Sequence, residues 1–321
     1  MPSMLGKKEW TVGAVGAFAI AAGAFALRRG TAPRRSGGRG HCLPISANRA
    51  AVVEAAQRLN RGAGLIATST LLDSAFEHYR GSFHNKAMFT PLVASALTLA
   101  VSVHGTGDQR KVAHKVRDPI YAAAAVTGVI GTGFHIYNIA KRPGGFSWQN
   151  LFYGSPLGAP AAVALSGLLG YYSERLRDSH SMRPRVFGFR AGRAIAALTS
   201  VGLLATAAEA GLLHFRGAYH DPFMFVPVTV PPLGAILLAE TAASHPRRPR
   251  RFTGWWLRLT ALVGCLGSAF HTWGVARNMG GWRNWRQNML NGPPIPAPPS
   301  FTGLALAGLA ALDLLRKHPN A

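Results

Sequence analysis

The chain has 321 residues, of which 48% are hydrophobic and 15% are charged. Soluble domains carry about 25% charged residues, so this composition is typical of a membrane protein. The net charge of +23 is of the kind that nucleic-acid-binding proteins use to neutralise phosphates. Here, however, the basic residues collect in the segments between apolar stretches, which is the pattern of a membrane topology signal. We therefore expect a lipid bilayer as a partner and no nucleic acid.

Nine apolar stretches come close to the length that crosses the roughly 30 Å hydrocarbon core of a bilayer. They span residues 11–27, 61–79, 87–105, 119–139, 156–172, 194–214, 222–241, 253–276 and 300–315. The first stretch follows Lys7 and Lys8 and has the composition of a signal-peptide core. The Arg-rich segment behind it favours a retained helix over a cleaved signal, because such a segment stays in the cytoplasm.

Lysine and arginine are distributed unevenly between the two sides of the predicted bundle. Twenty-four of them lie in one set of alternating connections, and eight lie in the other set. Positively charged loops stay in the cytoplasm, so this bias predicts a multi-pass inner-membrane protein with a cytoplasmic C-terminus. The connections that contain few basic residues then face the periplasm.

One sequence motif occurs twice in the chain, 136 residues apart. Residues 78–84 read HYRGSFH, and residues 214–220 read HFRGAYH. The fourteen positions from 78 to 91 contain seven identities, and matches continue to His135 before a two-residue insertion shifts the offset to 138. Each copy contains four spans, and copies with an even number of spans have the same orientation. We expect two parallel copies related by an axis along the membrane normal.

The predicted fold is therefore an all-α integral membrane protein with an N-terminal helix and two tandem four-helix repeats, about nine spans in total. Residues 30–47, which are rich in glycine, arginine, proline and serine, are expected to be a cytoplasmic linker without fixed structure. The predicted segments are an N-terminal transmembrane helix or signal anchor (1–29), a cytoplasmic Arg-rich linker (30–60), repeat 1 (61–175), a cytoplasmic basic linker (176–193), repeat 2 (194–316) and a cytoplasmic tail (317–321).

The polar residues that recur in both copies lie at the predicted periplasmic ends of the helices. Three histidines and one carboxylate recur: His78, His84, His135 and Asp73 in the first copy, and His214, His220, His271 and Glu209 in the second. Neutral imidazole binds zinc, copper and haem iron, and a nearby carboxylate can orient a ligating ring. We expect the six histidines to be metal or haem ligands, oriented by the two carboxylates.

Two further recurring pairs extend this hypothesis. Met88 and Met224 offer sulfur ligands that suit haem or copper. Arg80 and Arg216 offer guanidinium groups for haem propionates or for an anionic headgroup. The two carboxylates also need partners: we expect Asp73 to pair with His135 or Arg80, and Glu209 to pair with His271 or Arg216. The alternative is that the histidines and arginines are polar caps, which satisfy free carbonyls at the headgroup level.

Common catalytic motifs are missing from the sequence. The chain has no Walker loop, no nucleophile elbow and no His-Glu-x-x-His motif, which argues against hydrolase and nucleotide-driven chemistry. We expect a membrane electron-transfer subunit that holds haem b or a transition metal and passes electrons between a periplasmic redox protein and quinone, as part of a membrane oxidoreductase. The alternatives are a cation- or proton-coupled transporter or channel that uses Asp73 and Glu209, and a structural membrane anchor for a periplasmic enzyme.

Overall fold

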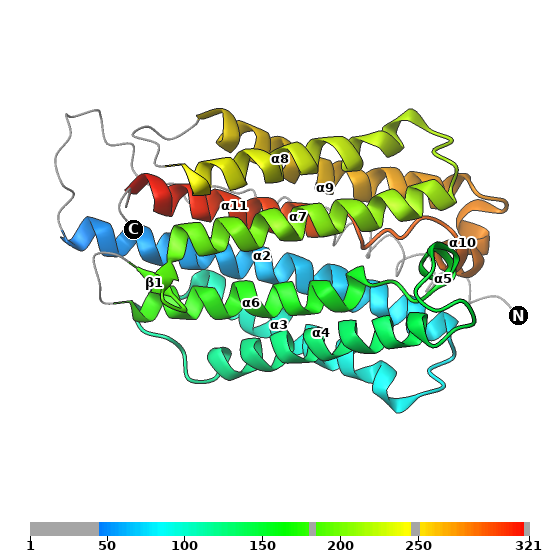
Figure 1. Ribbon diagram of the computed structural model, residues 1–321, viewed down its shortest axis with the longest axis horizontal. Coiled ribbons are helices and arrows are strands. Elements are labelled where there is room, and N and C mark those ends of the chain that lie inside the picture. Colours follow the sequence, from blue (N-terminus) through cyan, green and yellow to red (C-terminus); the bar gives the residue numbers. More distant parts are fainter. Residues whose placement is uncertain (1–44, 180–183, 245–250, 318–321) are drawn as a thin grey trace, which may run out of the picture.

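The computed structural model describes residues 45–179, 184–244 and 251–317, and the predicted helix within residues 1–29 lies outside this part of the chain. Eight long helices of the described residues run back and forth along the longest axis of the molecule (Figure 1). They are α2 (Ile45–Arg80), α3 (Thr90–Gly107), α4 (Arg117–Ala140), α6 (Gly158–Asp178), α7 (Ala191–Arg216), α8 (Val226–Ala243), α9 (Arg251–Arg277) and α11 (Pro299–Lys317).

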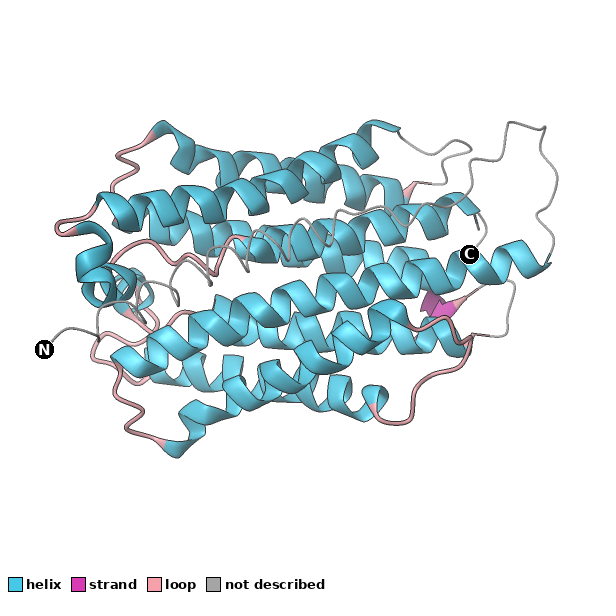
Figure 2. Ribbon diagram, turned by 180° about the vertical axis from the view of Figure 1, so that it is seen from behind, coloured by secondary structure: helices cyan, strands magenta, loops and turns pink. Residues whose placement is uncertain are grey.

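Short elements occupy both ends of this bundle. At one end lie η1 (Lys86–Phe89), α5 (Trp148–Tyr153), η2 (Pro222–Phe225), η3 (Gly281–Asn284) and α10 (Trp285–Asn291). We call this the histidine end, because His78 and His214 lie there. At the other end, β1 (Arg185–Val186) and β2 (Phe189–Arg190) form an antiparallel hairpin, and we call this the hairpin end. Apart from this hairpin, the described residues are helices, turns and loops (Figure 2).

The long helices form two halves, α2 to α6 and α7 to α11. In the first half α2 packs on α3 and α6, and α6 also packs on α4. In the second half α7 packs on α8 and α11, and α11 also packs on α9. The halves meet through α2 against α11 and through α6 against α7. The helices α2, α6, α7 and α11 therefore make the centre of the molecule, with the pairs α3/α4 and α8/α9 outside them (Figure 1).

Among the residues that the structure describes, five helices are long and apolar enough to cross a membrane: Lys86–Gly107, Arg117–Ala140, Ala191–Arg216, Pro222–Ala243 and Arg251–Arg277. These helices also carry exposed large apolar side chains, such as Val129 (63% exposed) and Ile130 (66%). Contiguous apolar surface of this kind is unfavourable in water and is what contact with lipid requires. The chain therefore has the helices expected of a protein embedded in a bilayer.

Three predicted spans, 61–79, 156–172 and 300–315, lie in helices that are not among these five. The helices concerned are α2, α6 and α11, which belong to the centre of the bundle. They bury small and hydroxyl-bearing residues against other helices, as Thr68, Ser166 and Thr302 show. Contact with protein rather than with lipid explains why these helices are less apolar than the outer ones.

Helix α2 begins at Ile45, whereas the sequence predicts a cytoplasmic linker for residues 30–60 and no fixed structure up to residue 47. The reason is an apolar face within the Arg-rich segment. Val52, Ala55, Ala56 and Leu59 recur at helical spacing and are buried in the core that includes residues of α11. Arg58 on another face pairs with Asp313 of α11. The charged residues of this segment lie outside the buried face of the helix: Glu54 is exposed, and Arg58 and Arg61 are half-buried.

The closest approach of α4 to α6 gives a test of this packing. A Cβ atom at Gly128 would collide with the backbone of Ala164, whereas a Cβ atom at Gly133 of the same helix would meet no atom within 4 Å. We expect Gly128→Ala to lower the unfolding free energy by about 1–3 kcal/mol, the usual cost of overpacking. The control Gly133→Ala should keep or raise it, because alanine favours helix. Thermal unfolding of the two variants in detergent measures the difference, and equal midpoints would contradict this packing.

Candidate functional site

The two turns at the histidine end that follow α2 and α7 have the same local structure. Each turn holds two consecutive non-glycine residues in the left-handed region of backbone conformation. They are Ser82, Phe83, Ala218 and Tyr219. Each turn ends at a side chain that accepts a hydrogen bond from a backbone N–H two residues later, Asn85 in the first and Asp221 in the second. Because left-handed conformations are unfavourable for bulky residues, other contacts must hold the turns in place.

A histidine from the preceding helix provides that contact in both turns. The Nδ1–H of His78 donates to the carbonyl oxygen of Met88 at 2.5 Å. The Nδ1–H of His214 donates in the same way to the carbonyl oxygen of Met224 at 2.7 Å. Each hydrogen bond ties the end of α2 or α7 to the short 3-10 helix that begins the return.

The histidines near the ends of α4 and α9 make a related contact. The Nδ1–H of His135 donates to the carbonyl of Pro156 at 2.6 Å, and that of His271 donates to the carbonyl of Pro294 at 2.7 Å. Both prolines lie in the connections that lead into α6 and α11, where the carbonyls are outside a regular helix. A neutral imidazole with its proton on Nδ1 has its lone pair on Nε2. All four rings therefore keep Nε2 as the nitrogen that can bind a ligand.

The structure brings these four histidines together as two pairs. The ring centres of His214 and His271 lie 6.5 Å apart, and the ring planes are inclined by 69°. His78 and His135 lie close enough for their charges to interact. The two histidines of each pair come from helices that pack on the same two neighbours rather than on each other. In the first half α2 and α4 both pack on α3 and α6, and in the second half α7 and α9 both pack on α8 and α11. The two histidines of a pair therefore come from opposite corners of their four helices.

His84 and His220, which the sequence places among the ligands, do not join these pairs. Both side chains are exposed, and the Nδ1–H of each donates to a glycine carbonyl of its own turn at 3.0 Å. The methyl groups of Met88 and Met224 lie against the same glycines. Met88 and Met224 therefore contact the histidines through their backbone carbonyls.

Asp73 and Glu209 lie at the seam between the two halves instead of beside the histidines. Glu209 accepts a hydrogen bond from the backbone N–H of Gly158 at the start of α6. Asp73 lies where its charge interacts with those of Glu209 and Arg80. No hydrogen bond joins either carboxylate to a histidine in the described residues. Five positions separate Asp73 from His78, which turns the two side chains about 140° apart around α2.

The two recurring arginines reach across the seam to the opposite half. Arg80 of α2 forms an ion pair with Glu77 and donates to the carbonyl of Leu290 near the end of α10 at 3.1 Å. Arg216 of α7 donates to the carbonyl of Phe152 near the end of α5. Carbonyls at the end of a helix have no partner within it, and a cation placed there also interacts favourably with the helix dipole. These contacts match the capping interpretation of the arginines.

The number of ligands restricts what the histidine pairs can hold. Within residues 45–179, 184–244 and 251–317, no three His, Cys, Asp or Glu side chains lie together in a way that could hold a metal ion. Structural zinc sites use four protein ligands, and catalytic ones use three. Two imidazoles are too few for such a site, but they suffice for haem iron, whose other four ligands come from the porphyrin.

A second polar cluster lies at the hairpin end of the first half, where the sequence predicted only basic loops. Arg117 and Glu174 have no exposed surface, and Arg177 and Asp108 are 2% and 9% exposed. Charged side chains are almost never buried to this extent unless they are paired. Burial by itself raises the pKa of Asp108, but hydrogen bonds from Arg110 and Arg117 outweigh it and hold this pKa far below its usual value.

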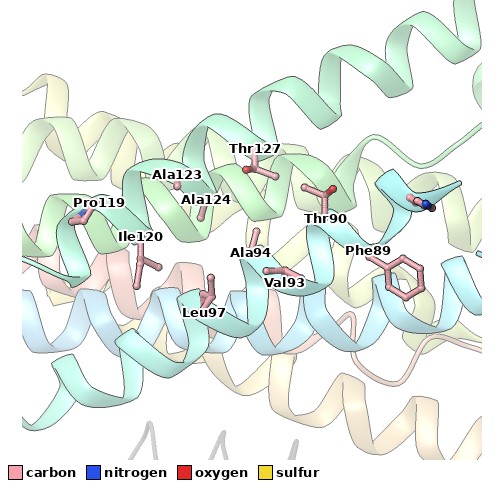
Figure 3. Close-up of a pocket in the computed structure, with 11 residues that line it drawn as sticks. Phe89, Thr90, Val93, Ala94, Leu97, Pro119, Ile120, Ala123, Ala124 and Thr127 are labelled. Atoms are coloured by element: carbon pink, nitrogen blue, oxygen red, sulfur yellow. The ribbon is translucent and has the colours of Figure 1, made fainter.

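An apolar groove of about 530 Å³ runs between α3 and α4 (Figure 3). Val93, Ala94 and Leu97 line one wall, and Ile120 and Ala123 line the other. In the second half the position of Ile120 is taken by a tryptophan, Trp256. Its Nε1–H donates to the carbonyl of Val230 at 2.7 Å, which places this large ring between α8 and α9.

Comparison of the chain with protein-family models finds no match, and neither do comparisons with curated proteins and with solved structures.

The crossed arginines give a prediction that links the halves. Arg216→Ala removes a hydrogen-bond donor and a guanidinium stacked 5.2 Å from the ring centre of Phe152. We expect backbone hydrogen exchange in α5, which belongs to the other half, to rise severalfold, because its last carbonyls lose their partner. Arg80→Ala should have this effect on α10 instead. The control Arg283→Ala, an exposed arginine at the same end, should change neither helix. Exchange that rises only within the mutated half would contradict the crossed contacts.

Proposed function

We propose that the chain is a membrane electron-transfer subunit that binds two haem b groups, one at each histidine pair. The observation that carries this proposal is the 6.5 Å separation between the ring centres of His214 and His271. Two imidazoles on opposite sides of one iron, each bound through a nitrogen about 2 Å from the metal, have ring centres about 6 Å apart. The spacing of the pair therefore suits the two axial positions of a single haem.

The hydrogen bonds of the rings also favour ligand binding. A metal-ligating histidine commonly donates its other N–H to a backbone carbonyl, which fixes the tautomer and orients the ring. His78, His135, His214 and His271 all do so. Haem, when bound, would supply one-electron chemistry at these positions. The chain itself holds the rings through these hydrogen bonds.

The two sites are proposed to be equivalent because the chain is proposed to consist of two parallel four-helix copies. Several local structures support this duplication at the offset of 136. The 3-10 helices η1 and η2, the helices α3 and α8, and the left-handed pairs after α2 and α7 all stand 136 residues apart. The close approach of Gly128 to Ala164 has its counterpart in that of Gly264 to Thr302.

The proposed orientation follows from the distribution of lysine and arginine. It places the histidine end at the periplasmic face of an inner membrane, and the hairpin end and the C-terminus in the cytoplasm. Both haems then lie at the periplasmic side, so electrons pass between a periplasmic redox protein and membrane quinone at this face. In this arrangement the electrons do not cross the bilayer.

Absorption spectroscopy of the full-length protein, purified in detergent from haem-replete cells, tests the proposal. We expect a Soret band and two haem b groups per chain by the pyridine haemochrome assay. His135→Ala and His271→Ala should each reduce the content to one, because each change removes one axial ligand from one pair.

The exposed histidines of the turns provide the matched controls. His84→Ala and His220→Ala remove an imidazole from the same end of the protein, and these variants should keep two haems per chain. A monodisperse wild-type protein without a Soret band would exclude the proposed haem sites. Loss of haem in all four variants alike would show that the histidines act only through the stability of the histidine end.

One observation favours the transporter as a second candidate function. Asp73 of α2 and Glu209 of α7 lie within electrostatic range of each other at the seam between the halves. Two carboxylates that approach each other in a bilayer can share a proton or a cation. Cation or proton uptake into proteoliposomes that is lost in Asp73→Asn, with the haem content unchanged, would support this function. The anchor hypothesis has no contact in the described residues that favours it.

A further inference from the structure

Arg117 is the centre of the buried ionic network at the hairpin end of the first half. Its guanidinium donates to both carboxylate oxygens of Glu174, at 2.9 and 3.1 Å, and lies 2.8 Å from the carboxylate of Asp108. Arg177 donates to the carbonyls of Gly105 and Asp108, at 3.0 and 2.8 Å, where α3 ends. The two buried arginines and the two buried carboxylates balance each other in charge. Together they fix the loop of residues 108–116 that joins α3 to α4.

The network continues into the bundle through uncharged groups. The hydroxyl of Tyr121 donates to the side-chain oxygen of Asn60 at 2.5 Å, and the hydroxyl of Ser173 donates to the same oxygen at 3.1 Å. The hydroxyl of Ser102 lies 3.1 Å from that of Tyr121, and that of Ser173 lies 3.3 Å from the carboxylate of Glu174. All of these side chains are buried. The network therefore joins α2, α3, α4 and α6.

The second half has no such network at the corresponding positions. At the offsets of 136 and 138, the residues that stand in place of Asn60, Ser102, Arg117, Tyr121, Ser173, Glu174 and Arg177 are Ala196, Leu238, Thr253, Leu257, Ala311, Leu312 and Leu315. Leu238 and Leu257 are buried and pack against Gly308, as Tyr121 packs against Gly170. Apolar residues thus build the same corner of the bundle without the cost of burying charges. Packing alone does not explain the network of the first half.

Two histidines, His104 and His114, lie at the edge of the network. The guanidinium of Arg117 donates to Nδ1 of His104 at 3.2 Å, and the backbone N–H of Val116 donates to Nδ1 of His114 at 3.2 Å. The ring centres are 5.1 Å apart, edge to face. Because Nδ1 accepts a hydrogen bond in both rings, each ring carries its single proton on Nε2. A second proton on either ring would turn Nδ1 into an N–H donor that faces the N–H donor of Arg117 or Val116, so that hydrogen bond would be lost.

The charges around His114 also oppose the protonation of this ring. Burial and the positive charges of Arg117 and Arg110 lower the pKa of His114, and the neighbouring His104 acts in the same direction. Glu174 acts against them, and the carboxylate of Asp178 accepts a hydrogen bond from the backbone of the same loop. The other charged groups near the rings on the loop, α4 and α6 are Asp108, Lys111, Lys115, Asp118, Arg175 and Arg177.

We propose that His104 and His114 form a proton-binding site that controls the loop between α3 and α4. With both rings neutral, the loop is clamped onto Arg117 and Glu174. A proton taken from the aqueous phase at the hairpin end breaks the bonds of Nδ1 to Arg117 or to Val116 and adds a positive charge beside Arg117. The clamped loop lowers the pKa of His114 and so disfavours a proton on this ring, whereas a released loop leaves His114 at the ordinary pKa of histidine, 6.5. The loop is therefore held above about pH 6.5 and released as the pH falls below it.

Release of this loop affects the helices on either side of it. Arg117 is the first residue of α4, and His104 lies in the last turn of α3. Their hydrogen bond joins these helices at the hairpin end, beyond the groove that separates them (Figure 3). Proton binding would thus loosen α4 from α3 in the first half only. The inference is independent of the haem proposal.

Hydrogen exchange measured by mass spectrometry on the full-length protein in detergent, at pH 8 and pH 5.5, tests this inference. After correction for the intrinsic exchange rates, we expect residues 108–116 to exchange at least tenfold faster at pH 5.5. Residues of α8, which contains no histidine, should show no such step. In the double variant His104→Asn, His114→Asn the side-chain oxygens can still accept the two hydrogen bonds but cannot be protonated at these pH values. The loop should then stay protected at both.

Two further variants separate the proton site from a general loss of structure. His220→Asn, at the opposite end of the protein, should keep the full pH step. Glu174→Gln weakens the clamp itself, so its loop should exchange rapidly at both pH values. The proposal is overturned if wild-type exchange shows no step, or if the step persists in the double variant. If the double variant does not fold, His114→Asn alone must reduce the step at least threefold.

Discussion

Within a bilayer, every backbone N–H and C=O group needs a partner in the protein, because no water is there to replace it. Long helices pair the backbone groups in their interior, so the groups without a partner are those at the helix ends. At the histidine end, imidazole and guanidinium side chains donate to backbone carbonyls there, as His78 does to Met88 and Arg80 does to Leu290. A ring that donates Nδ1–H to a carbonyl keeps the lone pair of Nε2 for a ligand. Capping and ligand binding are therefore compatible roles for one histidine.

The sequence was enough to predict where the long helices lie, but not which of them pack at the centre of the bundle. Apolar length and the repeated motif predicted the positions of eight long helices in the described residues, because both patterns are local. They did not show that α2, α6 and α11 form the centre, or that α2 begins at Ile45, because burial against another helix permits small and polar residues. The sequence placed His214, His220 and His271 in one candidate cluster, but it did not show that His214 pairs with His271 while His220 is exposed, because these contacts form only in the folded bundle.

The ionic network went unnoticed for a different reason. In the sequence, Arg117, Glu174 and Arg177 belong to connections whose basic residues are explained by membrane topology. The sequence feature that distinguishes these three residues is a difference between the two halves, because Thr253, Leu312 and Leu315 stand at the matching positions. The recurring residues predicted the histidine end, whereas the network lies at positions where the two halves differ.

The two ends of the first half are joined by rigid elements. On α4, Arg117 and His135 are eighteen residues apart, which is about 27 Å along a helix, and Asn60 and His78 have the same separation on α2. A ligand at the histidine pair and a proton at the hairpin end would therefore act on the same two helices. In the second half, α9 carries His271 near one end, and Thr253 stands near the other end in the place that Arg117 takes on α4. A coupling of the two ends through the ionic network would therefore act in the first half.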